Sequence, residues 1–169
     1  MRHAGAMLPS ELTDVAQQVG SILRERGETV AVAEGSAGGL ISAALLSVPG
    51  ASAYYVGGTV VYTLAASVAW MSGAVEVPPG MRGASEQFAA YLAASVRRRV
   101  DTTWGIGEAG AAGPANPYGD PAGHTWLAVD GPLSATRNVL TGVDDRSENM
   151  FAFARASLTL FADVLADAP

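Results

Sequence analysis

Residues 30–41 constrain the fold of this chain more than any other stretch does. They read Val-Ala-Val-Ala-Glu-Gly-Ser-Ala-Gly-Gly-Leu-Ile, an apolar β-type run followed by an acidic residue, small residues and a pair of glycines. This order predicts a buried strand that enters a helix through a tight turn and leaves backbone N–H groups free. Ligand sites of α/β proteins tend to lie at such turns, so we take this stretch as the centre of the fold.

The length and composition indicate a single domain outside a membrane. A chain of 169 residues is long enough to bury a full core. We expect a flexible N-terminus over residues 1–8 and one domain over residues 9–169. No apolar run approaches the roughly 20 residues that a membrane-spanning helix needs, and residues 1–7 lack the apolar centre of a signal peptide. We therefore expect a cytoplasmic protein with no membrane partner.

The residue types that are missing exclude several reaction classes. The sequence has no cysteine and no lysine, and all 10 of its basic residues are arginine. Without cysteine there are no disulfides, thiolate nucleophiles or cysteine zinc ligands. Without lysine, a mechanism that needs a titratable amine must use another group. His124 is the only histidine beyond His3, so we expect neither a metal site nor a cofactor.

The charge balance argues against nucleic-acid binding. The formal net charge is −6 and the sequence pI is about 4.7. A basic cluster, residues 97–99, falls at the end of a predicted helix, where cations interact favourably with the helix dipole. We expect no nucleic-acid partner.

Hydrophobic periodicity predicts an alternation of helices and strands. Helices are expected from Ser10 to a stop at Gly27, over 37–47, over 65–71, from Ser85 to the arginine triplet, and from Asp144 or Asp145 onward. Strands are expected over 29–33, 53–62, 103–107, 124–130 and 135–140. Gly57-Gly58 in the second strand indicates a bulge or a close backbone approach. This order favours an α/β fold, a three-layer α/β/α sandwich with a mixed, mostly parallel sheet.

Three loops would meet at one edge of the sheet if the strands before them are neighbours. They are the turn Glu34-Gly35-Ser36-Ala37-Gly38-Gly39, the pair Tyr62-Thr63, and the segment Gly110-Ala111-Ala112-Gly113-Pro114. N–H groups of the Gly38-Gly39 turn would suit a phosphate or carboxylate, and Ser36 either caps the helix or acts on a substrate. Tyr62 is equally explained as a tyrosine that ends a strand.

The third loop belongs to an irregular stretch, residues 109–123, in which glycine and proline recur. Long loops inside compact domains are often binding loops. Asn116 and Asp120 would either read polar groups of a ligand or stabilise turns. His124 has no evident orienting carboxylate in the sequence, which weakens a role as a base or ligand. Glu34, at the end of a buried strand, needs partners, either loop N–H groups or an arginine.

Several short motifs follow one another along the chain. Residues 33–40 read A-E-G-S-A-G-G-L, residues 48–52 read V-P-G-A-S and residues 58–62 read G-T-V-V-Y. Ser85-Glu86, Gly110-x-x-Gly113-Pro114, Pro121-x-Gly123 and Gly142-x-x-Asp145-Arg146 follow. This ordered set resembles the C-terminal domain of the CinA (competence/damage-inducible protein) family, which typically reads A-E-S-C-T-G-G-L at the first turn. The resemblance covers nearly the whole chain.

The resemblance implies a nicotinamide-nucleotide amidase, in which a serine nucleophile, assisted by a tyrosine and a lysine, releases ammonia from an amide group. This sequence departs from the family pattern at the chemistry. Gly35 stands in place of the serine, Ala37 in place of a threonine, and Ser67 where a lysine is typical. Ala109 replaces a further threonine. Glu34, Tyr62 and the glycines of the scaffold are kept.

We therefore expect a CinA-type domain with a degenerate active site that binds a nucleotide or another small anion and is catalytically impaired. The ligand-binding residues would be Glu34, Gly35, Gly38, Gly39, Gly110, Gly113 and Pro114. One alternative is an active nicotinamide mononucleotide amidohydrolase that uses Ser36 with Tyr62. Another is a non-enzymatic protein-interaction or assembly domain. The apolar richness and the exposed-looking Trp70 and Met71 favour a homo-oligomer.

Overall fold

The structure, a computed structural model, describes residues 8–169. Its α-helices are α1 (Ser10–Arg26), α2 (Leu40–Leu46), α3 (Leu64–Met71), α4 (Glu86–Val100) and α5 (Arg146–Asp167), with a short 3₁₀ helix η1 at Ala51–Ala53. Its strands are β1 (Val30–Glu34), β2 (Tyr55–Val60), β3 (Trp104–Ala111), β4 (His124–Asp130) and β5 (Ala135–Leu140). The expectation of a flexible N-terminus concerns residues that, apart from Leu8, lie outside the described ones.

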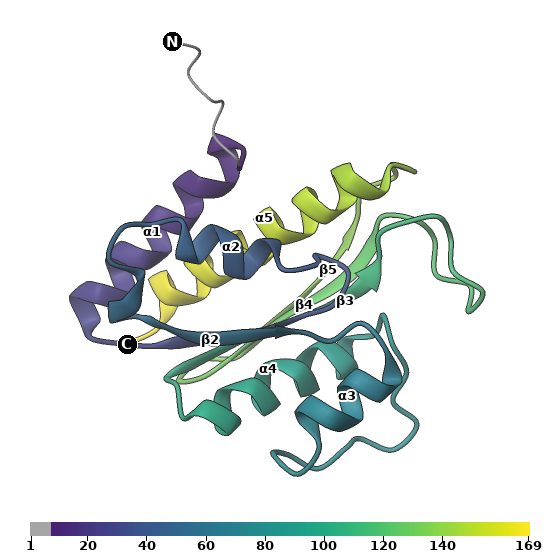
Figure 1. Ribbon diagram of the computed structural model, residues 1–169, viewed down its shortest axis with the longest axis horizontal. Helices are drawn as coiled ribbons and strands as arrows, with labels where there is room; N and C mark the ends of the chain where they lie inside the picture. The colour runs from purple at the N-terminus through teal and green to yellow at the C-terminus, as the bar shows by residue number, and fades with distance from the viewer. Residues whose placement is uncertain (1–7) are drawn as a thin grey trace.

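The strands form one mixed sheet in the order β2-β1-β3-β4-β5. β1 pairs in parallel with β2 and β3, whereas β4 is antiparallel to both β3 and β5. α1, α2 and α5 cover one face of the sheet, and α3 and α4 cover the other (Figure 1). This arrangement confirms the predicted three-layer α/β/α sandwich with a mixed sheet. Of the described strands, β4 alone runs against the others.

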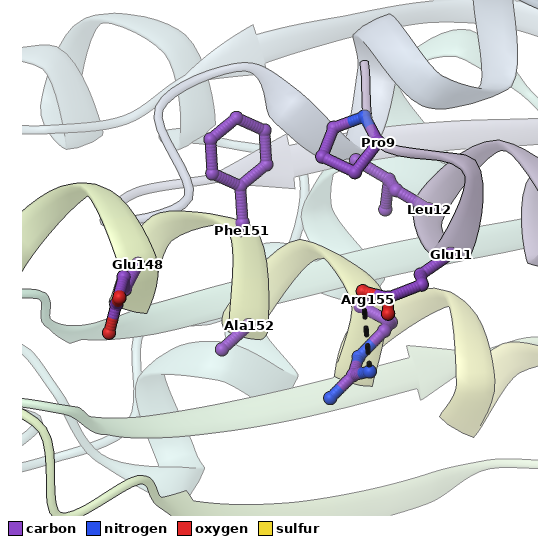
Figure 2. A pocket seen from close by; sticks show the side chains of 7 residues that line it. All are labelled: Pro9, Glu11, Leu12, Glu148, Phe151, Ala152 and Arg155. Carbon is purple, nitrogen blue, oxygen red and sulfur yellow. Dashed lines mark ion pairs between the residues drawn. The ribbon is translucent and has the colours of Figure 1, made fainter.

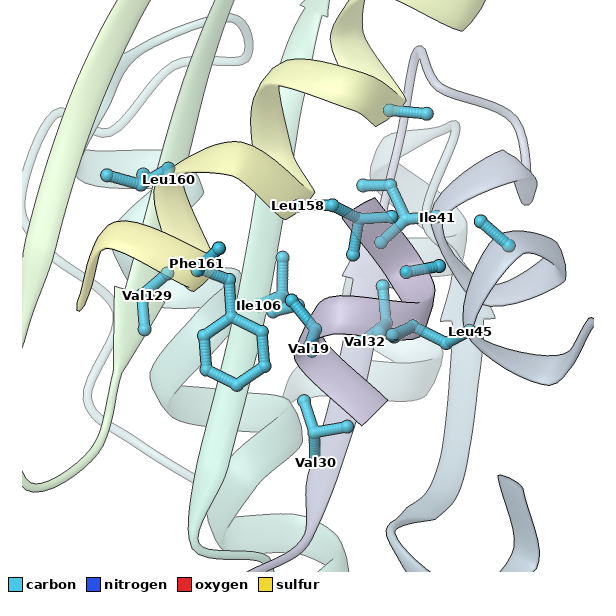
Figure 3. Close-up of a cluster of buried hydrophobic side chains, with 14 of the residues drawn as sticks. Val19, Val30, Val32, Ile41, Leu45, Ile106, Val129, Leu158, Leu160 and Phe161 are labelled. Carbon is cyan, nitrogen blue, oxygen red and sulfur yellow. The ribbon is translucent and has the colours of Figure 1, made fainter. Parts of the chain in front are cut away.

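The larger core lies between the sheet and the helices α1, α2 and α5 (Figure 3). Val19 from α1, Val32 from β1, Ile106 from β3 and Leu158 from α5 meet there, each at most 1% exposed. All five residues of β1 are buried. Burial of both faces of β1 explains why its sequence is a continuous apolar run instead of an alternating one.

Two glycines on β3 let α4 lie directly against the sheet. A Cβ at Gly105 or Gly107 would overlap the carbonyl oxygen of Ala93 or Ala89 on α4. Trp104, which precedes Gly105, and Ile106, which lies between the two glycines, point to the opposite face and join the larger core. The alternation of glycine with large residues therefore sets the spacing of two layers at once.

The helix ends follow local signals in the sequence. α1 ends at Gly27, which adopts a left-handed conformation with φ 65°. The side chains of Ser85 and Asp145 accept hydrogen bonds from the N–H groups of Phe88 and Glu148, as predicted for N-caps of α4 and α5.

The start of α2 differs from the prediction. The helix begins at Leu40 instead of Ala37, and residues 37–39 form a turn. Gly38 and Gly39 have φ values of 67° and 98°, which are incompatible with a right-handed helix. The glycine pair therefore delays the helix by one turn.

Two further expectations are corrected by the structure. β3 continues to Ala111, so Gly110 lies in a strand and the irregular loop starts later than expected. Trp70 is 56% exposed, as expected, but Met71 is only 1% exposed and belongs to the smaller core between the sheet and α4. The end of β3 was not predicted because its small residues give no hydrophobic alternation.

β2 carries the irregularity that Gly57-Gly58 indicated. Its pairing with β1 passes from Tyr55 to Gly57 and leaves Val56 as the extra residue of a bulge. A Cβ at Gly58 would lie 2.8 Å from the hydroxyl oxygen of Ser42, so α2 also approaches closely here. The predicted bulge is confirmed, and it lies at Val56, directly before the glycine pair.

α5 is the one helix within residues 8–169 that is long and apolar enough to cross a membrane by length and composition alone. Its most apolar window has a mean hydropathy of 1.2, and 56% of that window is buried inside the domain. Phe153, Leu158 and Phe161 are fully buried against the sheet and α1. The apolar face of α5 is therefore explained by the core.

Candidate functional site

The carboxyl ends of β1, β2 and β3 lie side by side. In the sheet register, Glu34 of β1 faces Val60 of β2 on one side and Glu108 of β3 on the other. The loops after these strands therefore leave the sheet at the same end (Figure 1). We call this end of the three strands the strand-end edge; it is distinct from the outer strands β2 and β5. As predicted, the turn 35–39, Tyr62 and the Gly113 loop come together.

The carboxylate of Glu34 closes the N-terminus of α2. It is fully buried and accepts hydrogen bonds from the N–H groups of Gly39, Ile41 and Ser42, each at 3.0 Å, and from the Ser42 hydroxyl at 2.7 Å. Burial is the main cause that raises the pKa of the Glu34 carboxyl, while the hydrogen bonds from Ser42 and Ile41 act in the opposite direction. Of the two kinds of partner expected for Glu34, the structure supplies the loop N–H groups.

The N–H groups of the glycine pair are therefore already occupied. Gly38 donates to the carbonyl oxygen of Gly35 at 3.1 Å, and Gly39 donates to Glu34. The prediction that these N–H groups are free to bind a phosphate is wrong. A side chain of the chain itself holds the position that an external anion would take at this helix N-terminus.

A second buried carboxylate, Glu108 on β3, holds the other half of the turn. It accepts hydrogen bonds from the N–H groups of Gly35 (3.1 Å) and Ala37 (2.8 Å) and from the hydroxyls of Ser36 and Thr125, the latter at 2.6 Å. Sequence reasoning missed this residue. Its signal was an acidic residue inside an otherwise apolar strand, since such a group is buried only with several donors around it.

Ser36 turns its hydroxyl into the domain. The residue is 6% exposed, and its Oγ donates to the Glu108 carboxylate. A Cβ at Gly35 would instead lie 3.2 Å from the carbonyl oxygen of Val61 and 3.4 Å from that of Glu108, toward the end of β2. A serine at position 36 therefore points in a different direction from a serine at position 35.

Arg146, the first residue of α5, links the second and third loops. Its guanidinium donates to the Tyr62 hydroxyl (2.8 Å) and to the carbonyl oxygen of Gly113 (2.6 Å), and its central carbon lies 5.9 Å from the centroid of the Tyr62 ring. One turn later, Asn149 donates to the carbonyl oxygen of Ala112 at 2.7 Å. Sequence reasoning had Arg146 only as part of a motif, because only the tertiary structure brings it to Tyr62.

The predicted glycines play different parts at this edge. Gly113 is buried beside Arg146 with φ 133°, and its peptide bond to the exposed Pro114 is cis. Gly110 lies within β3, where a Cβ would collide with Thr125 of β4. Gly113 and Pro114 thus belong to the strand-end edge, whereas Gly110 has a packing role in the sheet. Tyr62 also lies at the strand-end edge, and it is 64% exposed to solvent.

The long third loop is held by its own polar side chains. Asn116 Oδ1 accepts hydrogen bonds from the N–H groups of Tyr118 and Asp120, both at 3.0 Å. Asp120 also forms a two-point ion pair with Arg82, with both N–O distances 3.0 Å. The hydrogen bonds from Arg82 are the main cause that lowers the pKa of the Asp120 carboxyl. Of the two roles considered for Asn116 and Asp120, the structure shows the stabilisation of turns.

His124 has a carboxylate nearby that its sequence context did not reveal. Its Nδ1 is buried without a hydrogen-bond partner and lies 3.9 Å from Asp120 Oδ1, while Nε2 lies 2.9 Å from Asn138 Nδ2. Within residues 8–169, no group of three His, Cys, Asp or Glu side chains is arranged to hold a metal ion.

A cavity of about 250 Å³ lies between the start of α1 and the N-terminal half of α5 (Figure 2). It is lined by Pro9, Glu11, Leu12, Glu148, Phe151, Ala152 and Arg155. Arg155 and Glu11 form an ion pair across it at 3.9 Å. None of the strand-end residues lines this cavity, so we keep it separate from the candidate site.

The fold is an α/β domain in which the loops after three parallel strands, β1, β2 and β3, leave the sheet at the same end. The family model of the CinA C-terminal domain matches residues 12–165. This chain therefore belongs to the CinA C-terminal domain family, as its motifs suggested.

Curated relatives agree with this membership, and a solved structure shares the fold. A CinA-like protein of Myxococcus xanthus is 37% identical over 139 residues, which are 82% of this chain and 33% of the relative. A CinA-like protein of Synechocystis is 35% identical over 133 residues, 78% of this chain and 32% of the relative. The chain thus spans about a third of the length of these curated relatives. The crystal structure of competence/damage inducible protein CihA from Agrobacterium tumefaciens shares the fold, with a TM-score of 0.86 at 24% identity, covering 94% of this chain and 98% of that one.

Proposed function

We propose that this CinA-type domain binds a nucleotide at the strand-end edge without hydrolysing an amide group. The observation that carries the proposal is the Ser36 hydroxyl, which is buried and donates to the Glu108 carboxylate. No other residue of the turn 35–39 has a hydroxyl. A nucleophile must reach the reacting carbon, and a hydroxyl that is held in the core does not meet this condition.

The positions that assist the nucleophile in the family also lack the required groups. The resemblance implies a lysine where Ser67 stands, and Ser67 is a neutral, buried residue of α3. It implies a threonine where the chain has Ala37, whose N–H donates to Glu108. Loss of a nucleophile or of its base usually lowers the rate by several powers of ten. These replacements support an impaired active site.

Arg146 and Tyr62 are the groups that support ligand binding. A guanidinium has five N–H donors, and the hydrogen bonds to Tyr62 and Gly113 use two of them. Among the ion pairs of the described residues, none involves Arg146. Its remaining donors suit a phosphate group, and the exposed ring of Tyr62 suits stacking of a pyridine ring or a nucleobase.

An active amidohydrolase that uses Ser36 is the competing proposal. It is favoured by the hydrogen bond from Ser36 Oγ to Glu108, because a carboxylate in that position would accept the serine proton as a general base. It also requires the turn to open so that Ser36 reaches the substrate. A protein-interaction or assembly domain, the third proposal, needs no ligand at this edge.

Two measurements on the purified chain separate these proposals. Calorimetry with nicotinamide mononucleotide measures binding, and an ammonia assay with the same compound measures hydrolysis. We expect binding without ammonia release. Arg146→Gln should weaken binding by about tenfold or more, because it removes charge-assisted hydrogen bonds. Arg155→Gln, on the same helix but outside the site, is the matched control and should bind as the wild type does.

Each other outcome points to a different conclusion. Ammonia release that disappears in Ser36→Ala would establish the amidohydrolase and overturn our proposal. Absence of both binding and release would favour the assembly domain. Equal affinities of Arg146→Gln and Arg155→Gln would show that the ligand binds away from Arg146.

A further inference from the structure

α5 carries one buried polar side chain whose hydrogen bonds leave its own helix. Asn149 is fully buried and lies one turn after Arg146. The other buried residues of α5 are apolar except Ser157, whose hydroxyl donates to the Phe153 carbonyl oxygen of the same helix at 2.8 Å. A buried amide group is costly unless its donors and its acceptor are paired.

The side chain of Asn149 uses both of its N–H donors and its oxygen. Nδ2 donates to the carbonyl oxygens of Ala112 at 2.7 Å and of Val143 at 2.9 Å, and Oδ1 accepts from the Thr141 hydroxyl at 2.6 Å. Carbonyl oxygens only accept hydrogen bonds, so these two contacts determine which end of the amide is Nδ2. Asn149 therefore ties two loops to α5, the third loop after β3 and the loop between β5 and α5.

Asn149 and Arg146 hold consecutive carbonyl groups of the third loop. The two residues are three positions apart and lie on the same side of α5. Asn149 binds the carbonyl oxygen of Ala112 inside the domain, and the exposed Arg146 binds that of Gly113 through Nη1 at 2.6 Å. Nη2 of the same guanidinium donates to the Tyr62 hydroxyl. A loop whose Ala112 carbonyl is fixed also presents the next carbonyl in a fixed place.

We propose that Asn149 is a positioning residue for the ligand site, because it fixes the loop whose Gly113 carbonyl holds the Arg146 guanidinium in place for an anionic group. The inference rests on the nucleotide binding proposed above. Arginine has a long side chain, and ordering it on binding costs conformational entropy. A guanidinium that is already held by two hydrogen bonds avoids part of this cost, which raises the affinity without any further contact to the ligand.

Asn149→Asp tests the proposal because it keeps the size of the side chain and removes both donors. Its carboxylate would face the carbonyl oxygens of Ala112 and Val143, so we expect the third loop to leave its position. Calorimetry with nicotinamide mononucleotide should give a Kd about tenfold higher than that of the wild type. Ser157→Ala removes a buried hydroxyl that bonds only within α5, so it is the matched control and should bind as the wild type does.

Thr141→Val is a second, milder variant. It removes the hydroxyl that donates to Asn149 Oδ1 at a residue that is only partly buried. The Kd should rise about threefold, because the Asn149 amide is then less firmly oriented. Circular dichroism checks that each variant is folded, and Thr141→Val carries the test if Asn149→Asp does not fold.

The Arg146 guanidinium supplies a readout that needs no ligand. Hydrogen bonds from both terminal nitrogens slow the rotation of the guanidinium, so NMR should resolve separate Nη–H signals, which are assigned by their absence in Arg146→Gln. We expect separate signals in the wild type and in Ser157→Ala, and merged signals in Asn149→Asp and Thr141→Val. A loss of stability alone would not merge these signals in a folded protein.

The outcomes separate this inference from the proposed function. If the wild type binds and the folded variants of Asn149 and Thr141 bind equally well, the role of Asn149 is overturned and the proposed function stands. A wild type that binds no nicotinamide mononucleotide would overturn the proposed function instead. The NMR signals then decide the positioning of Arg146 alone, and separate Nη–H signals in the folded variants would refute it.

Discussion

Removal of the Glu34 carboxylate is the most direct test of how the first turn is held. Glu34→Ala deletes the acceptor for the N–H groups of Gly39, Ile41 and Ser42. α2 has no other side-chain cap, because its N-cap residue is Gly39. The site is shielded from solvent, since Glu34 is fully buried, and we expect water to replace the lost acceptor poorly.

The expected cost follows from these contacts. Loss of a helix N-cap costs about 1 kcal/mol, and each buried N–H left unpaired costs about 1–3 kcal/mol. Part of this is offset, because a carboxylate whose pKa is raised by burial is itself costly to keep ionised. We expect Glu34→Ala to lower the free energy of unfolding by about 3 kcal/mol, which for a chain of this size lowers Tm by about 6–12 °C. Glu34→Gln keeps one oxygen acceptor and should lose about half as much.

The stability of the wild type should also depend on pH through this residue. Burial raises the pKa of Glu34 in the folded chain above its ordinary value of 4.5. The folded state therefore binds the proton more tightly than the unfolded state does. The contribution of Glu34 to stability is fully present below its ordinary pKa and declines as the pH rises through the raised value. Glu34→Gln lacks this titration, so the stability difference between wild type and Glu34→Gln should shrink with rising pH.

Urea unfolding followed by tryptophan fluorescence at several pH values measures both effects. Glu25→Ala, which removes an exposed carboxylate from α1, is the control and should change stability by less than about 0.5 kcal/mol. If Glu34→Ala cost no more than Glu25→Ala, the carboxylate would not be holding the turn. A stability difference between wild type and Glu34→Gln that stays constant with pH would contradict the raised pKa.

Two further predictions concern the third loop and the α4 face of the sheet. Arg82 lowers the pKa of Asp120, so the contribution of Asp120 to stability is present above the ordinary carboxyl pKa and is lost as the pH falls through the lowered value. The stability of Asp120→Asn should therefore fall less steeply with decreasing pH than that of the wild type. Superimposable acid-unfolding curves of the two proteins would contradict this. Gly107→Ala should cost about 3 kcal/mol, because its Cβ would overlap the Ala89 carbonyl oxygen and displace α4. Gly57→Ala, whose Cβ would meet no atom within 4 Å, is the control in urea unfolding, and equal losses in the two variants would refute the argument.

The elements of the fold were largely predictable because their signals are local. The strand β4, the limits of β5 and the caps at Ser85 and Asp145 follow from residues within one or two turns of each boundary. The prediction missed the end of β3, where Gly110 and neighbouring alanines give no hydrophobic alternation. Only pairing with β4 makes that segment a strand.

The site was harder to predict because its bonds join residues far apart in the sequence. Arg146 donates to Tyr62, which lies 84 positions away in the sequence, and Glu108 on β3 accepts from Ser36, 72 positions away. The sequence placed Glu34 correctly at the end of a buried strand and showed that it needs partners. It did not show that Glu34 accepts from the N–H groups of Gly39 and Ile41, of which the Gly39 N–H was expected to bind a ligand.

By itself, the sequence determined the order of helices and strands and the three-layer fold, because hydrophobic period, glycine conformation and capping act over a few residues. The sequence made the meeting of three loops conditional on neighbouring strands, and the strand order β2-β1-β3 meets that condition. The tertiary structure alone decided which polar groups are already satisfied. A buried carboxylate needs several hydrogen-bond donors, and these are the groups near it in space, which can be far from it in the sequence. For this reason Ser36 and the glycine turn became part of the scaffold, while Arg146 and Tyr62 were left facing solvent.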